Sequence, residues 1–223
     1  MNFTSQTRSI VIGGTSGIGK AVATALSERE GSVAVASRST GLDVTDEAAI
    51  EAYFAQHGPV DHVVLTAGSS APGGAVAEVA LEAARQAFDT KFWGSVMVAK
   101  AASRHIRPHG TLTLTSGFLS RRTLPGTYVK TAMNAGIEAV AKILAKELAP
   151  IRVNVVSPGL TDTEAYAGMG DEARASMLDK AARSLPAGKV GSAEELARGY
   201  LFAIDTPFVT GAVIDIDGGA LIN

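Results

Sequence analysis

The sequence contains no cysteine, which excludes disulfide bonds, thiolate metal sites and cysteine nucleophiles. It also lacks an excess of charge of one sign, because the formal net charge of the 223 residues is −2 at pH 7. Nucleic-acid binding through phosphate neutralisation is therefore not expected. No apolar run approaches the roughly 18 residues of a membrane span, and Ile10–Ile12 is too short for a signal peptide. We expect a cytoplasmic enzyme or binding protein.

Short β-branched runs alternate with longer Ala-rich stretches along the whole chain. Strands separated by helices are typical of right-handed β-α-β crossovers, so the pattern predicts a parallel sheet. The fold class is therefore α/β: a single-domain Rossmann fold over 1–223, doubly wound, with helices on both faces. The expected strands are 9–13, 32–37, 60–67, 110–116, 151–157 and 212–217. The expected helices are 17–29, 45–56, 78–106, 130–149 and 192–204.

The stretch "SIVIGGTSGIGKAVA" at 9–23 contains two phosphate-binding patterns at once. One is G-x-x-x-x-G-K, the beginning of a nucleoside-triphosphate P-loop. A P-loop requires Ser or Thr after its Lys to hold Mg²⁺, but Lys20 is followed by Ala21. The strands that would supply the metal-binding carboxylate end in "VVLTAG" and "TLTLTSG", without an acid. The P-loop interpretation is therefore the weaker one.

The other pattern is a glycine-rich turn of the dinucleotide-binding kind. Gly13 permits a sharp turn, Gly17 a close approach of the ligand, and Gly19 close packing of helix on strand. The loop follows a strand and begins a helix, so its backbone N–H groups would meet a pyrophosphate. A turn without a ligand is the alternative. The candidate contacts in this loop are Gly13, Thr15, Ser16, Gly17, Ile18 and Gly19.

Further motifs extend the pattern along the chain: "LDV" at 42–44, "TAG" at 66–68, "TSG" at 115–117, "RVNVVSPG" at 152–159 and "DGG" at 217–219. With the glycine loop, they resemble the short-chain dehydrogenase/reductase family in order and cover nearly the whole chain. The resemblance implies a Rossmann domain that binds NAD(H) or NADP(H), usually within a dimer or tetramer. Hydride transfer between the nicotinamide and a carbonyl or alcohol is the activity it implies.

The end of the second strand indicates which nicotinamide cofactor is bound. A carboxylate there would hydrogen-bond the ribose 2′-hydroxyl of NAD, but the sequence reads "VAVASRST", with no acid before Asp43. Arg38 can form a charge-assisted fork with a 2′-phosphate, and Ser37 and Thr40 can add hydroxyl groups. The expected cofactor is therefore NADP(H), although any surface loop can carry an arginine.

Other cofactor contacts follow from the resemblance alone. Asp43 and Val44 would contact the adenine, and the strand end at 66–68 would line the adenosine side. The segment after the expected strand 151–157 would meet the nicotinamide carboxamide and the diphosphate. Thr66 stands where the family usually has Asn, a departure from the pattern. These candidates are Asp43, Val44, Thr66, Ala67, Gly68, Pro158, Gly159, Leu160, Thr161 and Thr163.

The catalytic pattern of the family is broken in this sequence. Ser116, at the end of a strand, matches the family's Ser, but Tyr128 has Ala132 rather than Lys four residues on. Alignment from "AGIEAVAKILAKELAPIRVN" puts Lys130 in the family's Tyr position and Asn134 in its Lys position. Lys91, in "FDTKFWGS", falls in the family's Asn position. The candidate catalytic residues are Ser116, Tyr128, Lys130 and Asn134, with Lys91 near the cofactor ribose.

Two functions follow from this pattern. The first is a variant NADP(H)-dependent oxidoreductase acting on a small-molecule carbonyl or alcohol, in which Tyr128 or Lys130 supplies the proton. The second is an NADP(H)-binding sensor or scaffold with little or no catalysis. The resemblance also implies that 164–190 would cover the substrate. The four histidines are scattered without metal-ligand spacing, so no metal site is expected. Phe92 and Trp93 could pack subunits of a homodimer or homotetramer, or pack the core.

Overall fold

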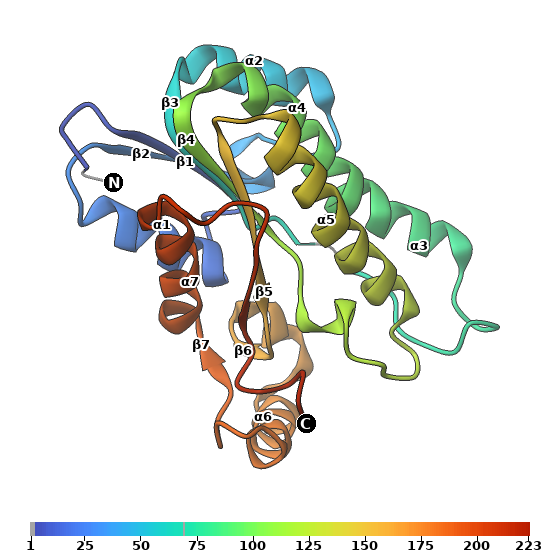
Figure 1. The fold of residues 1–223 in the computed structure, drawn as a ribbon. Helices are drawn as coiled ribbons and strands as arrows, with labels where there is room; N and C mark the ends of the chain where they lie inside the picture. The colour runs from blue at the N-terminus through green and yellow to red at the C-terminus, as the bar shows by residue number, and fades with distance from the viewer. Residues whose placement is uncertain (1–2, 69) are drawn as a thin grey trace.

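The computed structural model describes residues 3–68 and 70–223, and in them six parallel strands form the central sheet. Their order is β2-β1-β3-β4-β5-β8 (Figure 1). A short second sheet pairs β6 with β7. The strands are β1 (Arg8–Ile12), β2 (Ser32–Ala36), β3 (Val60–Leu65), β4 (Ile106–Thr115), β5 (Arg152–Pro158), β6 (Thr161–Asp162), β7 (Gly191–Ser192) and β8 (Val213–Ile216).

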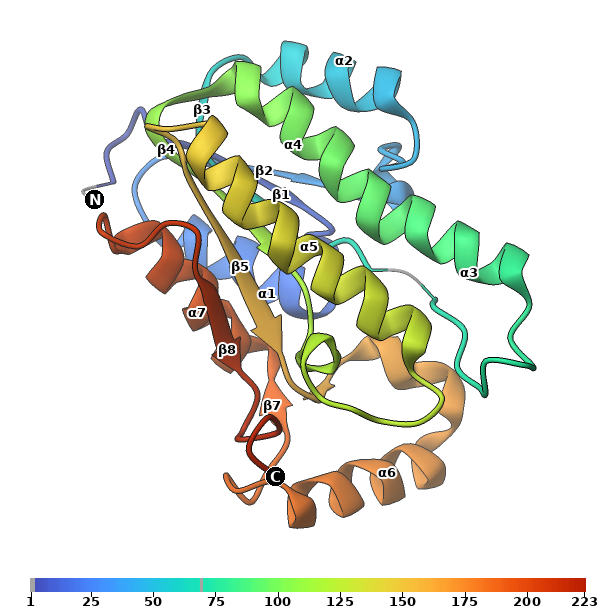
Figure 2. The same ribbon diagram turned by 45° about the vertical axis from the view of Figure 1, so that its right-hand side comes forward.

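Helices cover both faces of the central sheet, as the sequence predicts for a doubly wound fold. Helices α1 and α7 lie on one face, and α2, α4 and α5 on the other (Figures 1 and 2). The α-helices are α1 (Gly17–Ser27), α2 (Glu47–His57), α3 (Leu81–Phe88), α4 (Gly94–His105), α5 (Tyr128–Glu147), α6 (Asp171–Ser184) and α7 (Ala193–Asp205). The shorter turns are η1 (Arg38–Thr40), η2 (Asp89–Trp93), η3 (Phe118–Ser120) and η4 (Glu164–Met169). In the described part of the chain, no helix is long and apolar enough to cross a membrane.

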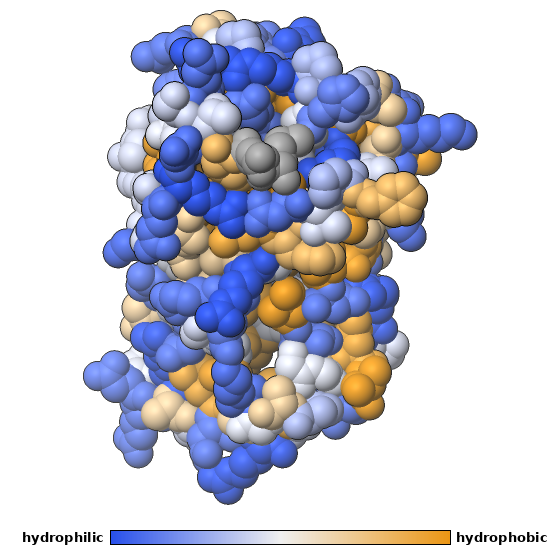
Figure 3. Space-filling model, turned by 60° about the vertical axis from the view of Figure 1, so that its left-hand side comes forward, coloured by the Kyte–Doolittle hydropathy of each residue, from blue (hydrophilic) through white to orange (hydrophobic). Residues whose placement is uncertain are grey.

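The sheet is buried on both faces, and this accounts for the continuous apolar runs of its strands. Residues Ile10–Ile12 of β1 and Val153–Val156 of β5 are all buried. On one side Phe54 of α2 and Ile137 of α5 belong to the larger core cluster. On the other side Leu26 of α1 and Tyr200 of α7 pack together in a second cluster. The surface in Figure 3 is largely hydrophilic, with apolar patches between the polar side chains.

The strand order changes direction at β1, which pairs with β2 on one side and with β3 on the other. Loops that leave β1 and β3 at their carboxyl ends therefore diverge, and such a switch point is where open α/β sheets bind ligands. The loops after β4 and β5 lie along the same edge because all these strands are parallel. The fold thus gathers at one sheet edge the loops after β1, β2, β3, β4 and β5 that carry candidate site residues.

The helical stretch expected at 78–106 is present from Leu81 to His105, but the structure divides it into α3, η2 and α4. The five-residue π-turn η2 interrupts the α-helical pattern, a feature that often occurs at functional sites. Gly94 follows it, and a Cβ there would lie 3.0 Å from a side-chain carbon of Val44. Close contact with the loop after β2 therefore accompanies the change in helical repeat. This turn carries Lys91.

Two further boundaries differ from the expectation. Strand β4 begins at Ile106 rather than 110, and its pairing with β3 shifts register between Val60 and His62. The first part of the strand was not expected because Pro108 and Gly110 are residue types that argue against a strand. Helix α5 begins at Tyr128 rather than 130 and ends at Glu147. The other expected strands and helices are present, with ends that differ by one or two residues.

Candidate active site

The glycine loop between β1 and α1 is shaped by the backbone of the neighbouring strand. Gly13 has φ +89°, and a Cβ there would lie 2.6 Å from the backbone nitrogen of Ala67. A Cβ on Gly19 would overlap the carbonyl oxygen of Gly13 and the hydroxyl of Thr66. That hydroxyl in turn donates to the carbonyl oxygen of Ile12 at 3.2 Å. Glycine at these positions is what lets the first turn of α1 approach the ends of β1 and β3.

A cleft of about 830 Å³ opens over this loop at the switch point of the sheet. It brings together most of the cofactor contacts expected from the sequence. They are Gly13, Thr15, Ser16, Gly17, Ile18, Gly19, Ser37, Arg38, Asp43, Val44, Thr66, Ala67, Gly68 and Thr163. The sequence reasoning missed six other lining residues: Ile12, Ser39, Leu42, Thr90, Glu164 and Ala165. Only their positions beside the motif residues could have indicated them.

The end of β2 presents Arg38 to the cleft without a competing carboxylate at the strand end. Its side chain is 76% exposed, and its Nε lies 4.0 Å from Asp43 Oδ2. Asp43 accepts hydrogen bonds from the backbone N–H and the hydroxyl of Thr45, and these lower its pKa, with the charge of Arg38 adding to them. Thr40 exchanges hydrogen bonds with the backbone of Ser37 and lies outside the cleft lining.

The loop after β5 approaches the cleft only at its far end. Thr163 lines the cleft, whereas Pro158, Gly159, Leu160 and Thr161 are not part of its lining. Gly159 instead packs on the residue that follows β8, because a Cβ on Gly159 would lie 2.6 Å from Cα of Asp217. The contacts of these four residues with the nicotinamide carboxamide and the diphosphate stay a prediction.

Ser116, at the carboxyl end of β4, is buried and belongs to a polar cluster. Its Oγ donates to Oε1 of Glu138 at 2.9 Å, and Ser120 donates to the same oxygen at 2.6 Å. The Nε of Arg121 lies 3.2 Å from Oε2 of Glu138, and the guanidinium also forms an ion pair with Asp215. Sequence reasoning did not identify Glu138. Its only signal is its position four residues after Asn134, on the same face of α5.

Lys91 lies on η2, beside Ser116. Its Nζ donates to the carbonyl oxygen of Ser116 at 3.1 Å. Burial, and then the charge of Lys130, lower the pKa of Lys91 to about 8. Lys130 itself is exposed on α5. Lys91 therefore contacts Ser116 directly and interacts with Lys130 through its charge.

Asn134 completes this group from the second turn of α5. Its side chain is buried, and a Cβ on Gly117 would lie 2.9 Å from Nδ2 of Asn134. Its Oδ1 is buried and has no hydrogen-bond partner within the described protein. A buried acceptor without a partner is costly, and a hydroxyl donor would satisfy it. Asn134 is not part of the lining of the cleft.

Tyr128 faces a different environment. As the first residue of α5 it packs against a small cluster that includes Val129 and Met133 and partly buried Val79 and Phe88. Its hydroxyl is buried and has no hydrogen-bond partner in the part of the chain that is described. Lys130 lies two positions on, about 200° around the helix. Tyr128 and Lys130 therefore do not share a face.

In residues 3–68 and 70–223, no group of three or more histidine or acidic side chains that could hold a metal ion is found. His62 is buried in the sheet, and its Nδ1 lies 3.0 Å from the hydroxyl of Thr111. Burial lowers the pKa of His62 to about 4, so it is neutral at neutral pH. It is a core histidine with a hydrogen-bond partner.

The glycine loop at a switch point and the cleft above it define the class of a dinucleotide-binding Rossmann protein. The family model described as enoyl-(acyl carrier protein) reductase matches residues 37–220. The short-chain dehydrogenase/reductase ATR9 of Stachybotrys chlorohalonatus is 33% identical over 250 residues, covering 96% of each chain. Carbonyl reductase family member 4 of Danio rerio is 31% identical over 94% of this chain and 96% of the relative.

Solved structures give the same result. A small-chain dehydrogenase in complex with NADPH has a TM-score of 0.96 and 53% identity, over 98% of this chain and 100% of that chain. A second small-chain dehydrogenase structure has a TM-score of 0.91 and 50% identity over the same shares. The chain belongs to the short-chain dehydrogenase/reductase family, a family of oxidoreductases.

Proposed function

We propose that this protein is an NADP(H)-dependent oxidoreductase that acts on a carbonyl or alcohol group of a small molecule. The observation that carries the proposal is the cleft at the switch point, which combines a glycine loop with an exposed Arg38 and has no carboxylate at the end of β2. The NADPH named for the similar small-chain dehydrogenase structure supports the same cofactor. When bound, the cofactor supplies or accepts a hydride.

The residues present fit that cofactor. The backbone N–H groups of the glycine loop and the guanidinium of Arg38 in the cleft can hold its phosphates. Outside the lining of the cleft, the partnerless Oδ1 of Asn134 and the ammonium of Lys91 would hold the ribose hydroxyls. Residues 1–223 would act as one dinucleotide-binding unit, with 164–190 as the cover of the substrate.

For the proton we favour Lys130 over Tyr128. Lys130 is exposed on α5, and its charge adds to burial in lowering the pKa of Lys91 to about 8. The hydroxyl of Tyr128 is instead enclosed among apolar side chains of α3 and α5. Ser116 would orient the substrate oxygen. The proton would thus move between the substrate oxygen and the side chain of Lys130. Because Lys130 is exposed, it can exchange that proton with solvent.

The second candidate is an NADP(H)-binding sensor or scaffold. One observation favours it: the hydroxyl of Ser116 already donates to Glu138, so it must turn before it can donate to a substrate. Turnover separates the two candidates. Steady oxidation of NADPH with any member of a panel of aldehydes and ketones would establish catalysis, whereas cofactor binding without turnover would favour the sensor.

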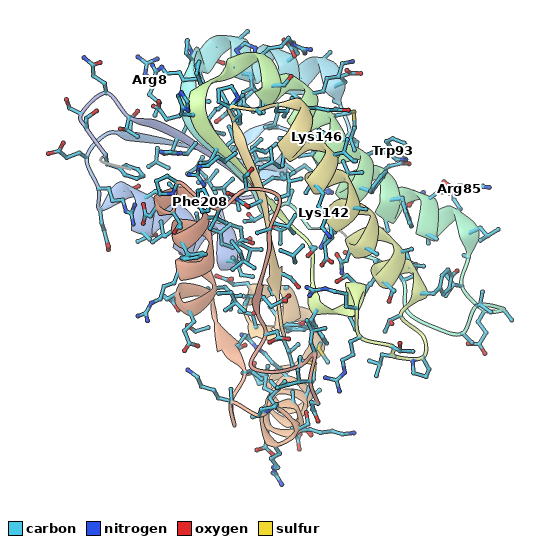
Figure 4. All side chains as sticks on the ribbon, in the orientation of Figure 1. Arg8, Arg85, Trp93, Lys142, Lys146 and Phe208 are labelled. Carbon is cyan, nitrogen blue, oxygen red and sulfur yellow. The ribbon has the colours of Figure 1, made fainter. Side chains whose placement is uncertain are left out.

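The experiment that tests the cofactor is a fluorescence titration with NADPH and NADH. We expect NADPH to bind much more tightly than NADH. Arg38→Ala should weaken NADPH binding about 10- to 100-fold, the range for a charge-assisted hydrogen bond, and leave NADH unchanged. Arg85→Ala, at an exposed arginine on α3 away from the cleft (Figure 4), is the matched control. Equal affinity of the unmodified protein for the two cofactors would refute the NADP(H) assignment.

We also propose that the protein forms a homodimer or homotetramer. Trp93 is 53% exposed and points away from the sheet beside α4 and α5 (Figure 4). Ile143 on α5 is 57% exposed as well. Sedimentation equilibrium would show a mass of two or four chains. A single-chain mass at micromolar concentration would exclude such an assembly.

A further inference from the structure

The side chain of Glu164 accepts a hydrogen bond from a backbone N–H group of the glycine loop that the proposed cofactor needs. The backbone N–H of Gly17, at the start of α1, donates to Oε2 of Glu164 at 2.9 Å. Gly17 is one of the loop residues whose N–H groups point toward the candidate pyrophosphate position. A side-chain carboxylate and a phosphate oxygen carry the same charge and accept the same hydrogen bonds. They therefore compete for this position.

The electrostatics show that this carboxylate is held as an anion. Hydrogen bonds from its own backbone N–H and from that of Gly17 lower the pKa of Glu164, and the charges of Lys20 and Arg174 lower it further. Glu164 is nevertheless exposed to solvent and begins the short turn η4. A charged group on an exposed turn can be displaced without disturbing the core.

The structure also provides a place for the displaced side chain. A second hollow of about 690 Å³ lies between α1, α7 and the segment after β6. Gly17, Thr163 and Glu164 line both this hollow and the cofactor cleft, so Glu164 stands at the boundary between them. The second hollow is also lined by Lys20 and Arg174, the two cations whose charges lower the pKa of Glu164.

The segment that carries Glu164 is connected to the proposed substrate cover. Thr163 receives a hydrogen bond from the N–H of Ala165 and so holds the first turn of η4, and Asp162 pairs with Arg174 of α6. A movement of Glu164 would therefore be transmitted through these contacts to the first turns of α6. Cofactor binding and the position of the 164–190 segment are linked through these contacts.

We propose that Glu164 is an autoinhibitory gate: its carboxylate holds the Gly17 amide in the free protein, and the cofactor pyrophosphate must displace it toward Lys20 and Arg174. The proposal rests on the proposed cofactor site and adds a regulatory step to it. Removal of the negative charge should favour NADPH, because binding then no longer breaks a charge-assisted hydrogen bond or opposes a nearby anion.

The test compares Glu164→Gln with the unmodified protein in NADPH titrations. We expect about fivefold tighter binding of NADPH by the variant, the upper range for an exposed charge interaction. Adenosine 2′-phosphate, which contains no pyrophosphate, should bind both proteins equally in competition assays. Glu28→Gln removes the same charge from the second hollow, away from Gly17, and should leave NADPH affinity unchanged. Unchanged or weaker NADPH binding by Glu164→Gln would overturn the gate.

A second measurement does not need the cofactor. Hydrogen exchange of the Gly17 amide, followed by NMR in the free protein, should be faster in Glu164→Gln, because a neutral amide oxygen is a weaker acceptor. Equal exchange rates would show that the contact is not formed in solution. If no variant binds NADPH but Gly17 exchange still responds, the cofactor proposal fails while the contact itself stands.

Discussion

The ammonium of Lys91 donates a hydrogen bond to the carbonyl oxygen of Ser116, 3.1 Å away, and so joins η2 to the end of β4. The two residues come from different layers of the fold, and the π-turn positions Lys91 for this contact. A buried ammonium with one backbone acceptor is poorly compensated for its lost hydration. Its charge therefore depends on pH in a way that can be measured.

Because of Lys91, the free energy of unfolding should change with pH in the alkaline range. Burial, and then Lys130, lower its pKa from 10.5 to about 8, so between these pH values the unfolded chain holds more protons at this residue. The free energy of unfolding then rises with pH over that window, while below pH 8 the cost of burying the charge is fully present. Lys91→Met should gain most stability over the unmodified protein below pH 8, and the gain should shrink toward pH 10.5. Urea denaturation at a series of pH values measures it.

The control for this series is Lys142→Met, at an exposed lysine on the same helix as Lys130 (Figure 4). Its effect on stability should stay constant over the same pH range. A gain for Lys91→Met that does not change between pH 7 and pH 10.5 would show that Lys91 keeps its ordinary pKa in the folded protein.

Ser116 should matter for turnover and not for cofactor binding. Its hydroxyl lies at the carboxyl end of β4, and loss of a group that orients the substrate oxygen typically costs about 10²-fold or more in rate. Ser116→Ala should therefore reduce kcat/KM by about that factor, with the Kd for NADPH unchanged. Ser120→Ala is the matched control, because Ser120 donates to the same oxygen of Glu138. Equal loss in both variants would mean that the Glu138 network, rather than Ser116, supports turnover.

The fold could be read from the sequence because its strongest signals are local. Apolar runs such as 151–157 and the glycine loop at 13–19 specify strands and a turn with little help from distant residues. The π-turn within 78–106 could not be predicted, because no spacing in the sequence indicates it and the contact of Gly94 with Val44 beside it joins residues fifty positions apart. The cleft was predictable as a set of motif loops at one sheet edge.

The catalytic end of the site was harder to predict. Ser116 and Lys91 could be placed by pattern, but their contact depends on the π-turn, which no spacing rule reveals. Glu138 and Glu164 escaped notice because a single carboxylate on a helix or in a loop is usually a solvated charge. Only tertiary structure brings one to Ser116 and the other to Gly17.

Tyr128→Phe distinguishes the two proton donors considered from the sequence. Because the phenol oxygen is buried without a partner, its removal should leave the free energy of unfolding unchanged or raise it by about 1 kcal/mol. Turnover should stay within a few-fold, whereas Lys130→Met should reduce it by about 10²-fold. A loss of 10²-fold or more in Tyr128→Phe would instead assign the proton to the phenol. Carbonyl-dependent oxidation of NADPH, followed by absorbance, measures both variants.

Gly19→Ala tests whether the close approach of α1 to the neighbouring strands is needed for the fold. Alanine in a helix normally gains about 1 kcal/mol over glycine. Here the new Cβ would overlap the backbone oxygen of Gly13, which cannot move as a flexible side chain would. Overpacking costs about 1–3 kcal/mol, so the net effect should be destabilising. Gly168→Ala, where nothing lies within 4 Å, should change the free energy of unfolding little. If urea denaturation shows Gly19→Ala to be as stable as Gly168→Ala, the glycine at 19 serves the ligand alone.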